Sequence, residues 1–185
     1  MKKLPLSVLI PTLNELANLR ELVPLLAFAE EIVIVDSFSS DGTAEWAAAE
    51  GIRLLQRPYD TPSEQKNWAI PQCTQNWVLI FDADERPTTE LIIEISQLFA
   101  HSERLERFDA YWIRRQNHFL GHRIRYSGWQ NDAVIRLIRR ENCRYENRRV
   151  HEEIERKGLK ISRLRAPMLH FTYRSLDHFI DKLQR

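Results

Sequence analysis

Apolar blocks alternate with amphipathic segments along the first hundred positions of the chain. Nearly continuous apolar runs are typical of buried strands, and they cover residues 6–13, 30–37, 52–58 and 77–81. Segments with apolar residues at helical spacing follow them, at 14–29, 41–51, from about 63 and at 88–100. Asn14 is expected to cap the first helix, and Gly51 to end the second. Strands that alternate with helices predict an α/β fold with a parallel sheet covered on both faces.

The pattern changes after Phe108, where long helical segments give way to strands. Residues 109–121, 131–140 and 158–171 are expected to be strands separated by loops that contain Gly or Asn, and an amphipathic helix is expected at 175–185. No linker or repeat interrupts the chain. We therefore expect one domain, residues 1–185, in which an α/β half (1–108) continues into a mixed, more antiparallel half (109–185).

The acidic stretch after the fourth predicted strand needs a positive partner. Asp82 and Asp84 are two residues apart, so strand geometry would project both side chains from one side while Ala83 points away. Two carboxylates held together at neutral pH require a counter-cation, and oxygen ligands of this kind suit Mg²⁺ or Mn²⁺. Acids at strand ends also cap helices or pair with arginines, so the spacing alone leaves both readings open.

Polar residues also follow the first two predicted strands. The segment "PTLNE" follows the first, and Asp36 and Asp41 follow the second. Because ligands of open parallel sheets bind at the carboxyl ends of the strands, these clusters should meet on one rim with the acids at 82–85. Either aspartate could cap a turn, and a carboxylate at Asp36 could equally accept hydrogen bonds from a nucleobase or ribose.

Composition bounds the class of protein. With 185 residues, of which 43% are hydrophobic and 29% charged, the chain is expected to be globular and soluble. It contains no run near the roughly 18 apolar residues of a membrane span, and Pro5 and Pro11 interrupt any secretory h-region. Cys73 and Cys143 lack disulfide or metal-site spacing, which predicts buried thiols in a cytoplasmic protein.

Charge is distributed unevenly. Residues 1–50 hold three Lys/Arg against eight Asp/Glu, whereas residues 114–165 hold fifteen against six. This asymmetry indicates an anionic partner for the second half, although mixed pairs on a solvated face would give the same counts. One arginine-rich stretch alternates in part with apolar residues and could offer a face to phosphates, or serve solubility alone. It contains Arg136, Arg139, Arg140, Arg144, Arg148 and Arg149.

Four segments in order, "SVLIPTLNE", "EIVIVDSFSSDGT", "SEQKNWA" and "VLIFDADE", resemble the family-2 glycosyltransferases of the GT-A fold. The resemblance implies a Rossmann-like nucleotide-binding half with a mostly parallel sheet, which continues into an acceptor-side half. It implies a metal site at Asp82 and Asp84. His170, in "MLHF", could reach the metal or the pyrophosphate, or be a half-buried core residue. The implied nucleotide-sugar-binding residues are Pro11, Thr12, Glu15, Asp36, Asp41, Lys66 and Asp82.

The second half resembles a subgroup similar to lipopolysaccharide core glucosyltransferases, through "GWQNDAVIRLIRR", "VHEEI" and "MLHF". This implies a role in cell-envelope glycolipid or polysaccharide synthesis. An inverting transfer needs a base that removes the proton of the acceptor hydroxyl. Glu152, beside His151, is the first candidate by resemblance, Glu153 is the second and Asp132 the third. Asp132 could equally cap a loop or pair with Arg136.

Further features bear on the acceptor. The Q-x-x-R-W signature of processive synthases is absent from the sequence, so we expect one sugar per encounter. Trp129, beside Gly128, could stack on an acceptor sugar or pack against other residues of the protein. Trp46 and Trp77 are expected in the core. The expected partners are a nucleotide-sugar donor, a glycan or phosphorylated glycolipid acceptor and, peripherally, the inner face of the membrane.

The sequence thus predicts a metal-dependent, inverting glycosyltransferase, and three alternatives remain. A sugar-1-phosphate nucleotidyltransferase shares the architecture, but "PTLNE" lacks its glycine-rich loop. A nucleic-acid-binding protein would use the basic half, but the acidic clusters would repel a polyanion, so nucleic acid is not an expected partner. The third is a non-catalytic relative that binds nucleotide. Members of the subgroup often continue further, so part of the acceptor side is expected to lie beyond residue 185.

Overall fold

The N-terminal half is a parallel sheet with a helix after each of its first three strands, as the sequence predicts. The computed structural model describes residues 2–126, 128–146 and 153–173. The strands are β1 (Leu4–Thr12), β2 (Ala29–Asp36), β3 (Arg53–Gln56) and β4 (Trp77–Ile80). The helices are α1 (Leu16–Leu22), α2 (Thr43–Ala49) and α3 (Pro62–Ala69), with 3₁₀ turns η1 (Val23–Leu26) and η2 (Ile70–Gln72). The strands pair in parallel in the order β3-β2-β1-β4.

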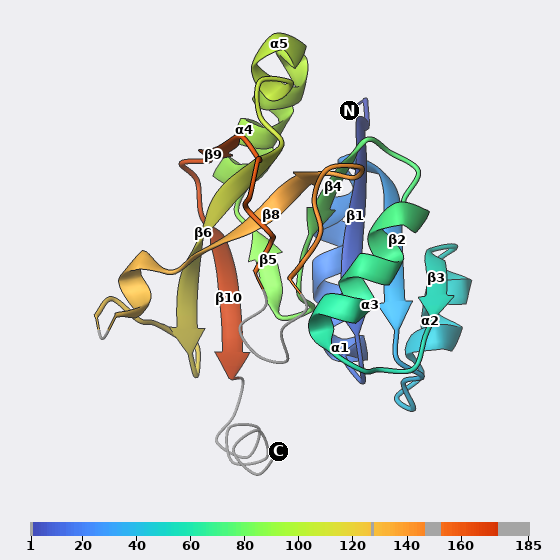
Figure 1. Cartoon of the computed structure of the whole chain (residues 1–185). Helices are drawn as coiled ribbons and strands as arrows, with labels where there is room; N and C mark the ends of the chain where they lie inside the picture. Colours follow the sequence, from blue (N-terminus) through green and yellow to red (C-terminus); the bar gives the residue numbers. More distant parts are fainter. Residues whose placement is uncertain (1, 127, 147–152, 174–185) are drawn as a thin grey trace.

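The second half extends this sheet with mixed strand directions. Its elements are β5 (Glu85–Pro87), α4 (Thr89–Ala100), α5 (Ser102–Leu105), β6 (Ala110–Phe119), β7 (His122–Arg123), η3 (Trp129–Asn131), β8 (Ala133–Arg139), β9 (Ile161–Arg163) and β10 (Met168–Tyr173). Strand β8 pairs antiparallel with both β4 and β6, and so joins the halves. Within the described ranges, the full order is β3-β2-β1-β4-β8-β6-β10-β5, with β7 and β9 also paired to β6 (Figure 1).

Alternation along β1 supplies the sheet with two buried faces. Leu6, Val8 and Ile10 belong to a core cluster that contains residues of α1 and α4, whereas Leu9 belongs to a second cluster with residues of α3. Figure 1 shows α3 lying across the near face of β1. Because both faces are covered, the strands read as continuous apolar runs, and the sheet is a rigid support for the loops at its carboxyl edge.

The first helix is shorter than predicted. Pro24 follows α1, which ends at Leu22 and continues only as the 3₁₀ turn η1. Asn14 does not cap the helix: its φ is 55°, and its Oδ1 accepts the backbone N–H of Ser40 at 2.8 Å. Glu15 takes the N-cap position instead. A proline and a left-handed residue therefore trim both ends of a segment whose apolar spacing was helical throughout.

Two later segments also differ from the prediction. The strand expected at 158–171 is divided into β9 and β10, with Pro167 just before β10. Strand β4 ends at Ile80, and the acidic residues form a turn in which Glu85 N–H donates to the Asp82 carbonyl at 2.9 Å. Strand alternation is therefore not what orients Asp82 and Asp84. The helix expected at 175–185 lies outside the described residues.

Candidate active site

A cleft of about 340 Å³ opens where β1 and β4 end. Its walls come from the residues after β1, from α3, from the turn after β4 and from β10. The structure brings together here most of the residues that the family resemblance implied for donor and metal. Those that line the cleft are Pro11, Thr12, Glu15, Lys66, Asp82, Asp84 and His170.

Both carboxylate oxygens of Asp82 contact cationic side chains. Lys66 Nζ lies 3.1 Å from Oδ1, and Arg136 Nη2 pairs with Oδ2. Desolvation would raise the pKa of Asp82, but the charges of Arg136 and Lys66 outweigh it and hold the pKa well below its usual range. Lys66 is 2% exposed and lies over the ring of Tyr145, 5.3 Å from its centroid. Lys66 and Asp82 therefore form a fixed, charged wall of the cleft.

Arg136 links Asp82 to a second acid, Glu85, whose side chain is fully buried. The guanidinium lies 2.8 Å from Glu85 Oε1, and Glu85 Oε2 accepts the backbone N–H of Asp82 at 2.9 Å. Desolvation raises the pKa of Glu85 despite the opposing charge of Arg136, and the neighbouring Asp82 charge raises it further. One buried arginine thus holds two acids of the turn after β4 in place.

The ring of His170 is oriented by Asn117. Asn117 Nδ2 donates to Asp132 Oδ2 at 3.0 Å and to the Trp129 carbonyl at 3.3 Å, so its Oδ1 faces His170 Nδ1 at 2.6 Å. An amide oxygen only accepts, so Nδ1 carries the hydrogen. His170 Nε2 lies 3.6 Å from Asp84 Oδ1. A ring nitrogen and a carboxylate oxygen are both groups that can ligate a divalent ion.

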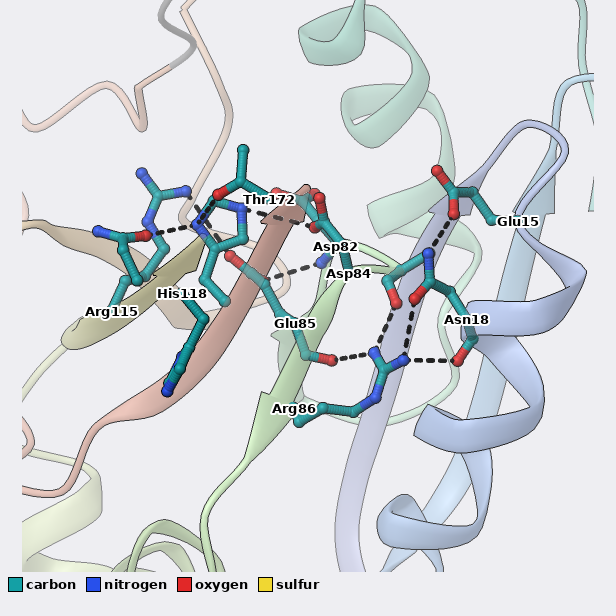
Figure 2. Close-up of polar contacts among 12 residues, drawn as sticks. Glu15, Asn18, Asp82, Asp84, Glu85, Arg86, Arg115, His118 and Thr172 are labelled. Carbon is teal, nitrogen blue, oxygen red and sulfur yellow. Dashed lines mark hydrogen bonds and ion pairs between the residues drawn. The ribbon is translucent and has the colours of Figure 1, made fainter. Parts of the chain in front are cut away.

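The turn that carries Asp84 is held from both sides. Phe171 N–H donates to the Asp84 carbonyl at 2.9 Å, which ties the turn to β10. On the other side, the buried Arg86 guanidinium donates to the Ala83 and Glu85 carbonyls at 2.6 and 2.7 Å, and to Asn18 Oδ1 of α1 at 3.0 Å. Figure 2 shows the side chain of Arg86 extending from β5 toward α1, with dashed bonds to Glu85 and Asn18. The sequence reasoning missed Arg86, although it directly follows the acidic stretch.

Asp36 and Asp41 do not line the cleft. Asp36 is fully buried, and it accepts hydrogen bonds from Ser39 N–H and Gln56 Nε2 at 3.1 and 3.2 Å. Asp41 accepts the N–H of Leu16 at 2.9 Å and the Thr43 hydroxyl at 2.6 Å, so it joins the start of α1 to that of α2. These are the contacts of loop-stabilising acids, and a role of either residue in nucleotide binding stays a prediction.

The three candidate bases have different surroundings. Glu152 lies outside the described residues. The Glu153 carboxylate is 44% exposed, pairs with Arg156 at 3.0 Å and lines a second cleft of about 320 Å³. Asp82 lines both this cleft and the first one, so the two adjoin. Glu153 therefore has access to a space next to the donor residues.

Asp132 also lines the second cleft, but its carboxylate is engaged. Its oxygens accept from Arg115 Nε and Nη2 at 2.8 and 3.0 Å, and from Asn117. Desolvation would raise the pKa of Asp132, but the hydrogen bonds from Arg115 and Asn117 lower it. Its partner is thus Arg115, where the sequence suggested Arg136.

Most of the arginine-rich stretch binds the protein itself. Arg136 is buried against the two acids, and Arg139 donates to the Phe108 carbonyl at 3.1 Å while covering Trp77. Arg140 and Arg144 donate to backbone carbonyls at 2.6 Å, including that of Cys73. Arg148 and Arg149 lie outside the described residues. The described arginines of this stretch stabilise the fold and do not present a free phosphate-binding face.

A match to a family model identifies the protein family of this chain. The model described as glycosyl transferase family 2 matches residues 7–154, which include the cleft residues of β1, α3 and the turn after β4. The chain belongs to glycosyltransferase family 2. The predicted family is thereby confirmed, and the predicted GT-A fold with it, since the solved structure of S. aureus TarS has the same fold.

Sequence relatives of this family-2 chain include a lipopolysaccharide enzyme. This chain is 34% identical over 186 residues to the lipopolysaccharide core biosynthesis glycosyltransferase LpsC of Rhizobium meliloti (strain 1021). The match covers 97% of this chain and 68% of LpsC. The chain is 36% identical over 115 residues to the uncharacterized glycosyltransferase RT0209 of Rickettsia typhi, covering 62% of this chain and 38% of that protein. Both relatives are longer than this chain.

A solved structure shows the same fold. S. aureus TarS 1–349 in complex with UDP superposes with a TM-score of 0.65 at 17% identity, covering 98% of this chain and 63% of that one. Another structure of TarS 1–349 contains UDP-GlcNAc and has a TM-score of 0.63. Among the described residues of this family-2 chain, no helix combines the length and apolar character that a membrane crossing requires.

Proposed function

We propose that this family-2 chain carries the catalytic domain of a metal-dependent, inverting glycosyltransferase that transfers one sugar from a nucleotide-diphosphate sugar to a hydroxyl acceptor. The observation that carries the proposal is the cleft at the ends of β1 and β4, where Lys66, Asp82, Asp84 and His170 gather. Similarity to LpsC supports an acceptor in lipopolysaccharide or another cell-envelope glycan.

Asp84 and His170 are the residues we assign to Mg²⁺ or Mn²⁺. The described residues contain no cluster of three or more His, Cys, Asp or Glu side chains that could hold an ion. A site with two protein ligands still suits these ions, since they keep waters and bind substrate phosphates. Asp84 Oδ1 and His170 Nε2 lie 3.6 Å apart in the cleft, and the two oxygens of Asp82 contact Lys66 and Arg136. When bound, the ion would neutralise the charge of the departing diphosphate.

Asp82, held by its two cations, is 32% exposed toward the cleft and remains ionised at neutral pH. We assign it to accept hydrogen bonds from hydroxyl groups of the donor, and Thr12 and Glu15 line the same cleft. Because TarS shares the fold and its structures hold UDP and UDP-GlcNAc, uridine nucleotides are the first donors to test.

We assign proton removal from the acceptor to the Glu152–Glu153 pair. Glu153 lines the cleft that adjoins the donor residues through Asp82, which supports this region as the acceptor side. Asp132 is the weaker candidate because Arg115 and Asn117 occupy its oxygens and lower its pKa. A base in this position contributes about 10²–10⁴ in rate. Glu152→Gln and Glu153→Gln should therefore differ in turnover rate. The variant that loses turnover while its donor affinity is unchanged identifies the base.

The proposal is tested by thermal unfolding with a panel of nucleotides. A nucleoside diphosphate at 100 times its Kd adds about 2.7 kcal/mol to the free energy of unfolding, which is several degrees in Tm. We expect such a shift in Tm with nucleoside diphosphates of one nucleobase in the presence of Mn²⁺. The shift should be lost with a chelator or in Asp84→Ala, and it should be retained in the control Glu103→Ala. Equal shifts with chelator would contradict metal dependence. Product analysis by NMR should show an inverted anomeric centre, and retention of its configuration would contradict the inverting mechanism.

A further inference from the structure

Three arginines outside the arginine-rich stretch lie at or beside the hairpin of β6 and β7. A cleft of about 290 Å³ is lined by Arg114, Arg123 and Arg125, all of which are exposed. Within the described part of the chain, no ion pair or hydrogen bond engages these three guanidinium groups. Arg115 also lines the cleft, but it is paired with Asp132. The lining contains no acidic side chain, so the three charges attract an anion.

Trp129 joins this cleft to the candidate active site. It is 39% exposed and lines both the arginine-lined cleft and a neighbouring one of about 360 Å³ that contains His170. Gly128 precedes it with φ of 84°, and Asn117 Nδ2 holds its carbonyl at 3.3 Å. Asn117 is the same residue that orients His170. An exposed aromatic ring in this position offers a flat, apolar surface to a sugar ring.

We propose that this surface, the arginine cleft of Arg114, Arg123, Arg125 and Trp129, binds an acceptor saccharide that carries a phosphate or carboxylate group. A sugar ring lies against Trp129, and its anionic group lies between the guanidinium groups, which suit phosphate and carboxylate oxygens. The inference rests on the proposed function, because the acceptor hydroxyl must reach the cleft of Asp84 and His170. The pocket shared by Trp129 and His170 provides that path.

The test is the binding of matched charged and neutral sugars in the presence of UDP and Mn²⁺. Glucose 6-phosphate and glucose form one pair, and glucuronic acid and glucose the other. The variant is Arg114→Gln/Arg125→Gln, and the matched control is Arg107→Gln/Arg163→Gln, which removes the same charge from exposed arginines elsewhere. We expect the wild type and the control to bind the charged sugar about tenfold more tightly than the neutral one, and the variant to lose this preference.

Further measurements distinguish a charged sugar from inorganic phosphate and from a lipid headgroup as the ligand of the cleft. Trp129→Ala should weaken charged and neutral sugars alike, by several-fold. If inorganic phosphate binds as well as glucose 6-phosphate and Trp129→Ala has no effect, the cleft is an anion site and not a saccharide site. If Arg114→Gln/Arg125→Gln loses binding to phosphatidylglycerol vesicles while its sugar preference persists, the cleft contacts lipid, and the proposal is wrong.

UDP binding, measured in the same variants, separates this inference from the proposed function. If the wild type binds UDP with Mn²⁺ but does not discriminate between charged and neutral sugars, the arginine cleft inference fails and the proposed function stands. If the wild type does not bind any nucleoside diphosphate, the proposed function itself fails.

Discussion

Replacing Arg136 with Met should destabilise the protein strongly, because one guanidinium serves two acids. Arg136 is 3% exposed, and it pairs with Asp82 and with the fully buried Glu85. Without it Asp82 keeps Lys66, whereas Glu85 keeps the Asp82 backbone N–H at 2.9 Å and, among the described arginine and lysine side chains, the more distant Arg115 at 3.7 Å. Removing one partner of a buried ion pair costs about 3–5 kcal/mol. Because the pKa of Glu85 is already raised, it can take up a proton, so we expect a cost near the lower end, about 3 kcal/mol.

The measurement is urea unfolding followed by circular dichroism. With an m-value of about 2–3 kcal/mol/M, a loss of this size moves the midpoint by roughly 1–1.5 M. Arg136→Met/Glu85→Gln should recover about half of the loss, and the exposed control Arg163→Met should lose under about 0.5 kcal/mol. The loss should also be smaller at pH 5 than at pH 8, since Glu85 protonates more readily at the lower pH. A cost below about 1 kcal/mol, or no recovery in the double variant, would show that Arg136 does not stabilise the two acids.

Three further predictions follow from other contacts. Asn117→Leu removes the acceptor of the His170 Nδ1 hydrogen, and should weaken Mn²⁺ binding about 10–100-fold by titration calorimetry, while unchanged affinity would contradict that role. Asp109 has a lowered pKa, chiefly because its carboxylate accepts the Lys160 N–H, so its stabilisation is present above the unfolded pKa of about 4 and is lost as the pH falls below it. The difference in unfolding free energy between wild type and Asp109→Asn should therefore be largest near pH 7 and shrink below pH 4, and a constant difference would contradict this sign. Gly42 has φ of 88°, so Gly42→Ala should cost about 1 kcal/mol and Gly42→Asn less, with equal Tm values arguing against backbone strain.

The fold was predictable where strands are buried on both faces of the sheet. The nearly continuous apolar runs of β1, β2 and β4 predict a sheet covered on both faces, and the structure contains such a sheet. Segments that depend on a single residue were less predictable. Pro24 follows the shortened α1, and the strand expected at 158–171 divides near Pro167, although apolar spacing alone favoured continuous elements.

The cleft was predictable from residue order, but its electrostatics were not. Lys66, Asp84 and His170 come from separate parts of the chain, and the family resemblance indicated that they share a site. The charge that lowers the pKa of Asp82 most is that of Arg136, which lies 54 residues away and appears in the sequence as one member of a basic stretch. Likewise, the sequence alone does not show that Arg114, Arg123 and Arg125 line one cleft without acceptors among the described residues, because only the tertiary structure shows which arginines already have acceptors.

In the proposed function, Asp84 and His170 hold a divalent ion beside a nucleoside diphosphate. Electron paramagnetic resonance of Mn²⁺ measures it most directly, by counting bound ions with and without UDP in wild type, Asp84→Asn and His170→Ala. We expect a single bound Mn²⁺, whose affinity rises with UDP in the wild type and falls at least tenfold in either variant. Mn²⁺ binding that is unchanged by both substitutions would contradict it.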